Sequence, residues 1–570
     1  MGPVDFTFLV GGPAGAGVML TGRVASKALV RGGYWVFATN EYPSLVRGGH
    51  NWFLARVCER RVYAQRLPID VLIALDEMTV ERHAPNLSER AAVIAERASI
   101  RTALTVSVPM SQIVKEEGAP LVARNMVALG AFFGLLGYDL NLVEETVRSE
   151  FKRRSRQVVD LNVRLVKRGY SYGREYEGAL GFRLPHTSNS KRLFLTGNDA
   201  TALGALAAGM RFYAAYPMTP ASPILHFLAA IEEDAGIVVV QPESEIAAIN
   251  MVIGAAYAGA RAMTATSGGG FSLMVEAFGQ AGMTETPIVV VEVQRPGPST
   301  GLPTYTSQGD LRFVLHASQG EFPRFVIAPG DVDEAFYLTA EAFNLAERYQ
   351  VPVVVLTDKY LAESYHTTQP FDATSMRIER GKLAEEGSVK RYAITEDGIS
   401  PRAFPGTPRA VVRANTSEHD EEGFGCSDPA VVRAMVEKRQ RKFERMREEV
   451  EARSDSVKTY GYEEPDVTIL LWGSVKGPAL EALRELEERG IRAAVVQVVF
   501  LAPFPTNRLR AELEGLGAPC LLVENNATAQ LGSLMREHLL FSPDEVLLKY
   551  DGRPFYPHEI ARKAEEVARK

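Results

Sequence analysis

The sequence predicts a multidomain α/β protein in which largely parallel sheets are wound with helices. Three observations support this fold class. Apolar runs of four to eight residues, rich in Val and Ile, recur along the chain and are typical of strands buried on both faces. Many of these runs lead through a loop into a segment of helical spacing, the order found in doubly wound folds. The 570 residues give room for about three or four domains that each bury a core.

Composition excludes several function classes. The chain carries 63 basic and 70 acidic residues, a net charge of −7, so no dominant basic surface for nucleic acid is expected. Its three cysteines, Cys58, Cys426 and Cys520, are far apart and form no C-x-x-C pair. An iron–sulfur cluster needs about four thiolates and a structural zinc about four Cys or His ligands, so we expect no metal centre in this chain alone. A disulfide framework and secretion are equally unexpected.

Neither a signal peptide nor a membrane span is predicted. The N-terminal residues MGPVDFTFLVGG lack the basic and apolar regions of a signal peptide. The longest apolar runs, at 287–293 and 351–357, are far shorter than the roughly 20 residues that cross a bilayer. We therefore expect a cytoplasmic protein.

The first predicted unit begins with a strand at Phe6–Val10, a glycine loop over 11–17 and a helix to about Val30. Glycines after a strand let backbone N–H groups approach a phosphate, although their order here is not the G-x-G-x-x-G of dinucleotide sites. A turn that packs the strand against the helix is the alternative. A further strand follows at Val71–Leu75, and residues 168–190, which are polar and rich in Gly and Tyr, are expected to form a linker.

Two further α/β units are predicted, with a connector between them. Residues 367–440 are polar, and Pro429–Arg453 is a helix rich in Glu, Lys and Arg, so this region is expected to brace its neighbours. The expected strands are Leu193–Thr196, Ile237–Gln241, Ala262–Ala265, Pro287–Val293, Phe325–Ala328, Val351–Leu356, Val467–Trp472, Ala493–Val499 and Cys520–Val523. The expected helices include Ala202–Met210, Pro478–Arg489 and Thr528–Leu540.

The loop Tyr216–Pro223 follows a strand-like segment and holds Thr219 between prolines. Proline restricts the backbone on both sides of Thr219, and a rigid loop with an exposed hydroxyl suits substrate positioning. The alternative is an ordinary helix N-terminus in which Thr219 or Ser222 is the cap.

Two acids, Glu243 and Glu245, precede a helix of small residues at 246–256. Acids in the first turn of a helix are expected from the helix dipole alone. A carboxylate among apolar residues at the end of a parallel strand is, however, also where active-site acids lie.

Arg295 leads a proline-stiffened loop directly after the strand Pro287–Val293. Its planar fork suits a carboxylate or phosphate, and a salt bridge with Glu292 or Glu276 is the alternative. Before it, Thr266–Phe271 repeats the order of strand, glycine loop and helix.

The segment Glu41–Asn51 is also unusual, because it combines Arg47, two glycines and His50. It is expected either to touch a ligand or another subunit, or to form a turn in which Arg47 pairs with Glu41.

Taken in order, these segments resemble the 2-oxoacid:ferredoxin oxidoreductases. Residues 5–75 resemble their gamma domain, which is Rossmann-like, and residues 193–365 with 466–570 resemble their alpha subunit. The matching segments are G-G-x-x-G-x-G, E-Y-P-S-L-V-R-G-G-H-N, Y-P-M-T-P-A-S, Q-P-E-S-E-I-A-A-I-N, T-S-G-G-G and R-P-G-P-S-T-G-L-P-T. A gamma–alpha fusion in one chain resembles the large subunit of 2-oxoglutarate:ferredoxin oxidoreductase. The domains implied are a gamma domain at 1–180, a pyrimidine-type thiamine diphosphate-binding domain at 191–365, a connector with a charged helix at 366–462 and a transketolase C-terminal-like domain at 463–570.

The resemblance also implies roles for site residues. Glu245 would hydrogen-bond the aminopyrimidine ring of thiamine diphosphate and activate it. Thr219 would contact the carboxylate and keto group of the substrate, and Arg295 would bind the carboxylate of a 2-oxo acid. The residues that would contact the cofactor are Tyr216, Pro217, Glu245, Ser267 and Gly268.

Half of the family's machinery is missing from this chain. It has no G-D-G with a downstream Asn, the pattern that binds the diphosphate through a divalent metal, and too few cysteines for a cluster. The resemblance therefore implies a beta subunit that carries Mg²⁺ and a [4Fe-4S] cluster, in a heterodimer that assembles as (alpha-beta)2. It also implies that the gamma domain binds no NAD.

The implied reaction is oxidative decarboxylation of 2-oxoglutarate with coenzyme A to succinyl-CoA, CO₂ and reduced ferredoxin, as in the reductive TCA cycle. Some relatives carry a cation directly after G-L-P-T, where Tyr305 stands here. Arg312 or His316 could reach a second carboxylate instead, so pyruvate or a broad range of 2-oxo acids stays open. A nicotinamide dehydrogenase built on the loop 12–17 and a non-catalytic scaffold subunit are the alternatives from other classes.

Overall fold

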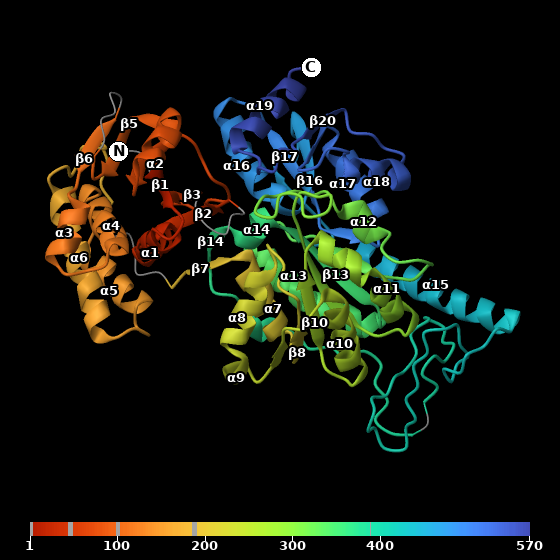
Figure 1. Ribbon diagram of the computed structural model, residues 1–570. Coiled ribbons are helices and arrows are strands. Elements are labelled where there is room, and N and C mark those ends of the chain that lie inside the picture. The colour runs from red at the N-terminus through yellow and green to blue at the C-terminus, as the bar shows by residue number, and fades with distance from the viewer. Residues whose placement is uncertain (1–3, 44–48, 98–102, 185–190, 388) are drawn as a thin grey trace. The chain divides into compact units, whose positions relative to one another are not determined.

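Figure 1 shows the computed structural model, which describes residues 4–43, 49–97, 103–184, 191–387 and 389–570. The chain divides into two compact units, Met1–Leu195 with Glu363–Pro370 and Thr196–Ala362 with Phe371–Lys570. Both units combine sheets with covering helices, as the recurring apolar runs predict. None of the helices in the described ranges is long and apolar enough to cross a membrane.

The first unit contains an eight-stranded sheet with the order β6-β5-β4-β1-β3-β2-β14-β7. The neighbours β1, β4, β5 and β6 run parallel, whereas β3 is antiparallel to both β1 and β2. The sheet is therefore mixed, because β2 and β3 are joined by residues 42–49, too few for a crossover helix. The strands are β1 (Asp5–Pro13), β2 (Trp35–Glu41), β3 (His50–Cys58), β4 (Ile69–Ala74), β5 (Leu87–Ala95), β6 (Leu104–Ser107), β7 (Leu193–Thr196) and β14 (Tyr365–Thr368).

The helices of the first unit pack closely where glycines face each other. α4 and α6 touch backbone to backbone, because a side chain at Gly130 would collide with the Val166 carbonyl and one at Gly169 with the Val127 carbonyl. The helices are α1 (Val18–Arg31), α2 (Glu77–His83), α3 (Met110–Glu116), α4 (Arg124–Leu135), α5 (Leu140–Glu150) and α6 (Arg156–Arg174), with 3₁₀ turns at Ala84–Asn86 and Leu121–Ala123.

The glycine segment of the first unit differs from the prediction. β1 continues through Gly11 and Gly12, which pair with Trp52 and Asn51 of β3, so these glycines lie in a strand. The loop is confined to the residues before α1, where Gly15 and Gly17 have positive φ angles of 86° and 79°. At Gly15 the backbone conformation alone favours glycine, whereas at Gly17 a β-carbon would also collide with Asn125 Nδ2.

The second unit contains two sheets, of which the larger has the order β18-β12-β13-β11-β10-β8-β9. All neighbours in it are parallel except β18, which is antiparallel to β12. Its strands are β8 (Phe212–Ala214), β9 (Val238–Val240), β10 (Ala262–Thr266), β11 (Ile288–Gln294), β12 (Phe325–Ile327), β13 (Pro352–Asp358) and β18 (Phe500–Ala502).

Helices cover both faces of this sheet, which explains its apolar strands. Val289 and Val291 face a core formed with α7, α8 and α13, while Val290 between them faces a core formed with α10 and α11. The helices of this part are α7 (Gly197–Ala207), α8 (Ser222–Ala230), α9 (Glu232–Ala235), α10 (Glu245–Tyr257), α11 (Gly268–Met283), α12 (Leu311–Leu315), α13 (Val332–Tyr349) and α14 (Lys359–Glu363).

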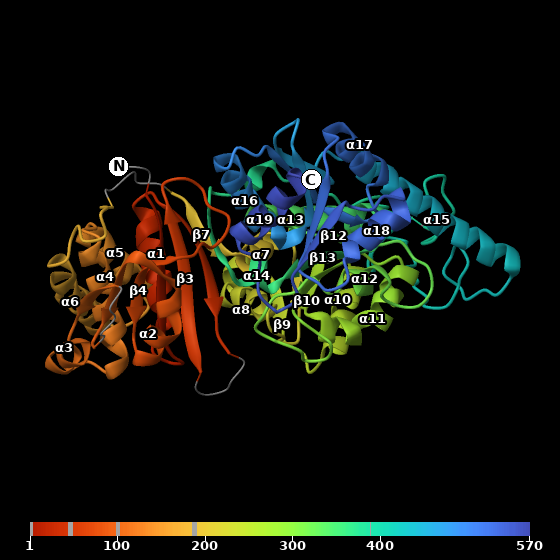
Figure 2. The same ribbon diagram turned by 90° about the horizontal axis from the view of Figure 1, so that it is seen from above.

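The smaller sheet of the second unit has the order β15-β17-β16-β19-β20, with only β15 antiparallel to its neighbour. Its helices α16, α17, α18 and α19 are labelled in Figure 2. Leu471 faces α16 and α19, whereas Leu470 faces α17 and α18. The elements are β15 (Val457–Gly461), β16 (Val467–Trp472), β17 (Ala493–Val498), β19 (Cys520–Glu524), β20 (Glu545–Leu548), a 3₁₀ turn (Gly473–Val475), α16 (Lys476–Glu488), α17 (Thr506–Leu516), α18 (Gln530–Leu539) and α19 (Pro557–Ala568).

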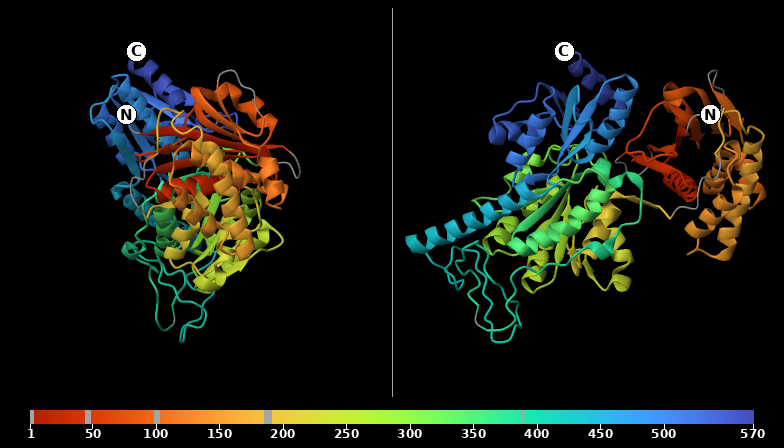
Figure 3. Two further views of the ribbon diagram at one scale, coloured as in Figure 1. Left: turned by 90° about the vertical axis from the view of Figure 1, so that its left-hand side faces the viewer. Right: turned by 180° about the vertical axis from the view of Figure 1, so that it is seen from behind.

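A long helix, α15 (Pro429–Ala452), follows the irregular segment that contains the 3₁₀ turn Ala373–Ser375 (Figure 3). Lys438 and Lys442 of α15 are buried, and both bind the buried carboxylate of Glu285, with Lys438 Nζ at 2.5 Å. Burial alone would raise the pKa of Glu285, but the two ammonium charges outweigh it and hold the pKa well below its usual range. This ion cluster fixes α15 against the larger sheet's helical layer.

Candidate active site

The predicted site residues come together at one edge of the larger sheet. Thr219 lies in the loop after β8, Glu245 opens α10 after β9, Ser267 follows β10, and Arg295 follows β11. These strands are parallel, so their carboxyl ends share one edge. Ligands of open α/β sheets bind at that edge.

Glu245 is the first residue of α10 and is only 4% exposed. The helix begins here because the Ser244 side chain accepts a hydrogen bond from the Ala247 N–H at 3.2 Å. A β-carbon at Gly270 would lie 2.7 Å from Glu245 Oε1 and would collide with Thr266 Oγ1. Glycine at 270 therefore makes the space in which the Glu245 carboxylate lies.

Arg295 is joined to the loop of Thr219. Its Nη1 donates a hydrogen bond of 2.6 Å to the Thr219 carbonyl oxygen. Across the described ranges Arg295 forms no salt bridge with Glu292 or Glu276, so its alternative role as their partner is not supported. α8 has Ala221 in the cap position with no side-chain hydrogen bond, so the alternative that Thr219 or Ser222 caps this helix is wrong.

Two acids that the motifs did not single out as site residues, Glu292 and Asp310, lie beside Arg295. Glu292 is fully buried, and neither carboxyl oxygen has a hydrogen-bond partner within the residues that the structure describes. Burial, reinforced by the charges of Asp310 and Asp358 and opposed by Arg295, raises the pKa of Glu292 well above its usual range. Burial also raises the pKa of Asp310 to about 6, against the opposing charge of Arg295. The one sequence feature that could have pointed to this pair is Glu292 itself, an acid within an otherwise apolar strand.

The predicted cofactor contacts lie around the start of α11 and the loop after β8. Ser267 is buried, and its Oγ has no hydrogen-bond partner among the described residues. A β-carbon at Gly268 would lie 2.6 Å from Asp310 Oδ2, so the chain approaches closely there. Tyr216 is exposed and Pro217 is half-buried. An unsatisfied buried hydroxyl near a buried carboxylate fits a polar heterocycle such as an aminopyrimidine.

The loop that follows Arg295 is held by the smaller sheet. Gln308 Nε2 donates to the Trp472 carbonyl, and Gln308 Oε1 accepts from the Asn525 N–H, both at 2.9 Å. The Arg553 guanidinium lies 4.0 Å from the centre of the Tyr305 ring. The segment after G-L-P-T is thus fixed by residues far away in sequence.

Arg312 and His316 line a different cavity. This cavity of about 370 Å³ lies between α12 and α18, and Arg295 is not among its lining residues. Arg312 Nη1 is paired with Glu537 at 2.8 Å. The arrangement therefore gives no support to a role of these two side chains beside Arg295.

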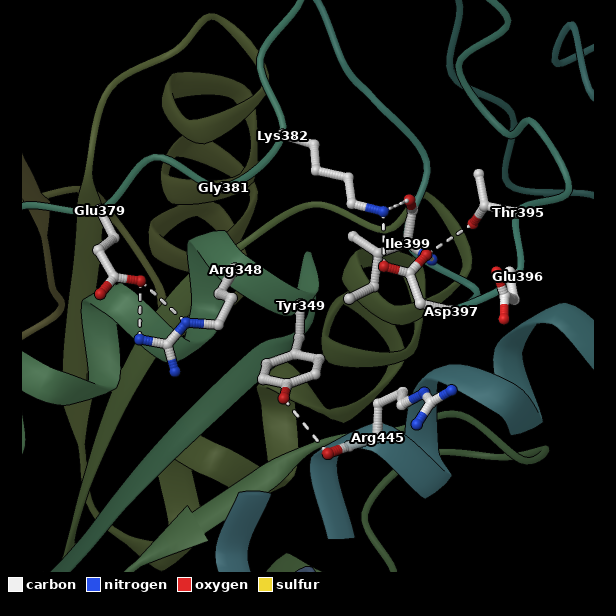
Figure 4. A pocket seen from close by; sticks show the side chains of 10 residues that line it. All are labelled: Arg348, Tyr349, Glu379, Gly381, Lys382, Thr395, Glu396, Asp397, Ile399 and Arg445. Atoms are coloured by element: carbon white, nitrogen blue, oxygen red, sulfur yellow. Dashed lines mark hydrogen bonds and ion pairs between the residues drawn. The ribbon is translucent and has the colours of Figure 1, made fainter. Parts of the chain in front are cut away.

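A cavity of about 820 Å³ is lined by residues of α13 and of the connector, including Arg445 of α15 (Figure 4). Tyr349 lines it just before β13 begins, whereas the site lies at the other end of that strand, about 20 Å away over seven residues. Its cations have partners of their own, since Arg348 binds Glu379 at 2.7 Å and Lys382 binds Asp397 at 2.5 Å. This charge balance favours a brace between α13 and the connector.

In the first unit, His50 pairs with a second histidine. Its Nε2 lies 3.0 Å from His83 Nε2, and burial lowers the pKa of both rings, that of His83 to about 4. The pair is thus neutral near pH 7. The predicted role of Arg47 falls outside the described residues.

Comparison with known proteins assigns the family. The model "Pyruvate flavodoxin/ferredoxin oxidoreductase, thiamine diP-bdg" matches residues 203–438, "Pyruvate ferredoxin/flavodoxin oxidoreductase" matches 7–172, and "Transketolase, C-terminal domain" matches 460–539. The alpha subunit of 2-oxoacid:ferredoxin oxidoreductase 2 from Aeropyrum pernix is 34% identical over 99% of this chain and 98% of its own. The chain belongs to the 2-oxoacid:ferredoxin oxidoreductase alpha-subunit family.

Other alpha-subunit relatives agree. The 2-oxoglutarate synthase subunit KorA of Methanothermobacter thermautotrophicus is 36% identical over 65% of this chain and 97% of its own. A structure of 2-oxoglutarate:ferredoxin oxidoreductase from Magnetococcus marinus, with 2-oxoglutarate, coenzyme A and succinyl-CoA bound, matches with a TM-score of 0.91 at 32% identity over 99% of both chains. The predicted family, the α/β fold class and the oxidoreductase class are therefore confirmed. The chain is an oxidoreductase subunit with a thiamine diphosphate-binding domain.

Proposed function

We propose that this alpha subunit acts with a beta subunit in the oxidative decarboxylation of a 2-oxo acid, with coenzyme A as acyl acceptor and ferredoxin as electron acceptor. One observation carries the proposal. The buried Glu245 carboxylate and the Arg295–Thr219 pair share one edge of the larger sheet. An acid for a heterocycle and a cation for a carboxylate are what this chemistry needs.

Each side chain has a distinct task in this proposal. Glu245 holds a proton in exchange with a ring nitrogen of thiamine diphosphate, while Ser267 and Gly268 border the same ring. When bound, thiamine diphosphate supplies the nucleophilic carbon that attacks the keto group and accepts the electrons released with CO₂. Arg295 binds the carboxylate of the substrate, and Thr219 orients its keto group. The burial of Glu245 and Ser267 keeps water from these two side chains.

An exposed apolar face on α10 and α11 supports a partner chain. Leu273 is 52% exposed, and Ile246 and Met251 of α10 are also exposed. A β-carbon at Gly254 or Gly269 would meet no atom within 4 Å. A surface of this kind, next to the site, suits close packing of another protein. We infer that the beta subunit docks here and brings the diphosphate site, Mg²⁺ and a [4Fe-4S] cluster, for which three cysteines are too few.

2-Oxoglutarate is the proposed substrate. The support is the similarity over 99% of the chain to an enzyme whose structure contains 2-oxoglutarate and succinyl-CoA. Pyruvate is the alternative, and the two are separated by comparing kcat/KM of the purified complex. A cytoplasmic location, an (alpha-beta)2 assembly and service in the reductive TCA cycle belong to the same proposal.

The proposal is tested with Glu245→Gln in the alpha–beta complex. Loss of the acid is expected to lower kcat by about 10²–10⁴-fold, in the range of a lost general acid–base group. Glu243→Gln is the matched control, because Glu243 is exposed two residues earlier. A scaffold subunit would retain wild-type turnover in both variants, and that result would refute the catalytic role.

A further inference from the structure

The fold buries the carboxyl group of Glu292, in β11, without giving it a hydrogen-bond partner among the described residues. Its side chain is inaccessible, and both oxygens lack a hydrogen-bond partner in the described part of the chain. In register, Glu292 pairs with Thr266 of β10, the residue that borders Glu245 at Gly270. Buried polar groups without a partner are rare, and an ionised one is far costlier than a neutral one. Glu292 is therefore held as the neutral acid.

Asp310 is the second acid beside Arg295, and unlike Glu292 it carries a charge. Its backbone N–H donates to Gln294 Oε1 at 3.0 Å, which fixes it at the end of the Arg295 loop. Its Oδ2 lies against Gly268 at the start of α11. Asp310 and Arg295 interact electrostatically without forming a salt bridge among the described residues. Asp310 is thus a nearby counter-charge that leaves the guanidinium fork open.

Two further acids, Asp358 and Glu245, lie near this edge. Asp358 of β13 is buried and accepts hydrogen bonds from the Leu361 N–H at 3.1 Å and from Thr306 Oγ1 at 3.2 Å. The Glu245 carboxylate lies next to Gly270, in the first turn of α11. Lys359, a buried cation directly after Asp358, has interactions of its own. The charge of Arg295 is offset chiefly by Asp310.

A substrate carboxylate changes this balance. Bound to Arg295, it adds a second negative charge close to Asp310, where burial already disfavours the carboxylate anion. A like charge at short range disfavours ionisation of a carboxylate, so the substrate and the Asp310 anion compete for one cation. By linkage, a proton on Asp310 must then favour substrate binding to the same extent.

We propose that binding of a 2-oxo acid at this edge is coupled to uptake of one proton by Asp310, with Glu292 as its permanently neutral neighbour. The inference rests on the proposed function, because it assumes that Arg295 binds the substrate carboxylate. Once that carboxylate has left as neutral CO₂ and the electrons have passed to the acceptor, Asp310 returns its proton to solvent. Asp310 and Glu292 are positioning residues, since they act through Arg295.

The experiment measures KM for 2-oxoglutarate against pH in the alpha–beta complex. Since the pKa of Asp310 is about 6, KM of the wild type is expected to rise by up to about 25-fold between about pH 6.5 and pH 8. The carboxylates of the substrate stay ionised over this range. A KM that is independent of pH would overturn the proposal without recourse to any variant.

Two substitutions identify the titrating group. Asp310→Asn imitates the protonated acid, so it is expected to keep a low, pH-independent KM where that of the wild type has risen. Glu292→Gln imitates a group that is already neutral and is expected to retain the wild-type slope. Asp397→Asn, at the distant 820 Å³ cavity, is the matched control and should also retain it. Loss of the slope in Glu292→Gln with retention in Asp310→Asn would contradict the assignment.

Arg295→Gln separates this inference from the proposed function. If its KM for the 2-oxo acid equals that of the wild type, the substrate is not bound at this edge and the proposed function fails there. If its KM rises but the wild type shows no pH slope, only the proton coupling is refuted.

Discussion

Arg295 and Thr219 are joined by a hydrogen bond of 2.6 Å from the guanidinium Nη1 to a backbone carbonyl, which ties the loop after β11 to the loop after β8. The bond occupies one corner of the guanidinium fork. Because the acceptor is a backbone atom, the bond fixes the position of the side chain without depending on the identity of residue 219. The orientation of Arg295 is therefore set by the fold.

Replacement of Arg295 by Lys is expected to weaken substrate binding. Lysine keeps the charge but cannot hold the Thr219 carbonyl and a carboxylate with one rigid fork. A charged hydrogen bond is worth about 1.5–3 kcal/mol, so KM for the 2-oxo acid should rise about 10- to 150-fold. Steady-state kinetics would show it. Arg312→Lys is the control, because Arg312 is paired with Glu537 in another cavity, and an equal rise in both variants would contradict the assignment.

Gly270→Ala is expected to disturb Glu245. The added methyl group would collide with Thr266 Oγ1 and lie 2.7 Å from Glu245 Oε1, so the carboxylate must move. Overpacking of this kind costs about 1–3 kcal/mol, and the displaced acid should lower kcat at least tenfold. Activity and the unfolding midpoint are measured together. At Gly515 of α17 an added β-carbon meets no atom within 4 Å, so Gly515→Ala should leave both unchanged or raise stability slightly.

Leu273→Glu is expected to prevent assembly with the beta subunit. A charge at the centre of an apolar docking face must be desolvated when the partner binds. The variant should fold, because Leu273 is 52% exposed, but should co-purify with much less beta subunit. Val411→Glu places the same charge on a residue that is 72% exposed in the connector and should assemble normally. Normal assembly of Leu273→Glu would locate the partner elsewhere.

Glu285→Gln is expected to destabilise the attachment of α15. It leaves Lys438 and Lys442 buried without their anion, a loss of about 3–5 kcal/mol by analogy with broken buried ion pairs. Denaturant unfolding measures this loss. Glu386→Gln, which breaks an exposed pair with Arg409, should cost at most about 1 kcal/mol.

The same cluster predicts a dependence of stability on pH. The pKa of Glu285 is lowered in the folded chain, so its stabilisation is complete above its unfolded pKa of about 4.3 and is lost as the pH falls further. The free energy of unfolding should decline more steeply with acid in the wild type than in Glu285→Gln. Parallel curves would show that Glu285 is not the titrating group.

The sequence was sufficient for the features that depend on local pattern. Residues 288–294 form a buried strand because their side chains face helices on both sides, and Glu245 and Arg295 follow strand ends as the motifs predict. The continuation of β1 through Gly11 was not predictable, because it depends on pairing with β3. Likewise, the importance of Glu292 and Asp310 depends on which groups surround them, and spacing along the chain does not reveal the absence of a hydrogen-bond partner.

The contacts of Gln308 with Trp472 and Asn525 have a consequence for how this protein can be recombined. The loop after Arg295 is held by residues that lie 164 and 217 positions further along the chain, at Trp472 and Asn525. In a chimera that exchanges residues 463–570 for those of a relative, the original loop after Arg295 would contact a replaced C-terminal segment. Substrate preference in such a chimera should depend on whether the replaced segment still holds Gln308 in place, as much as on the residues that touch the substrate.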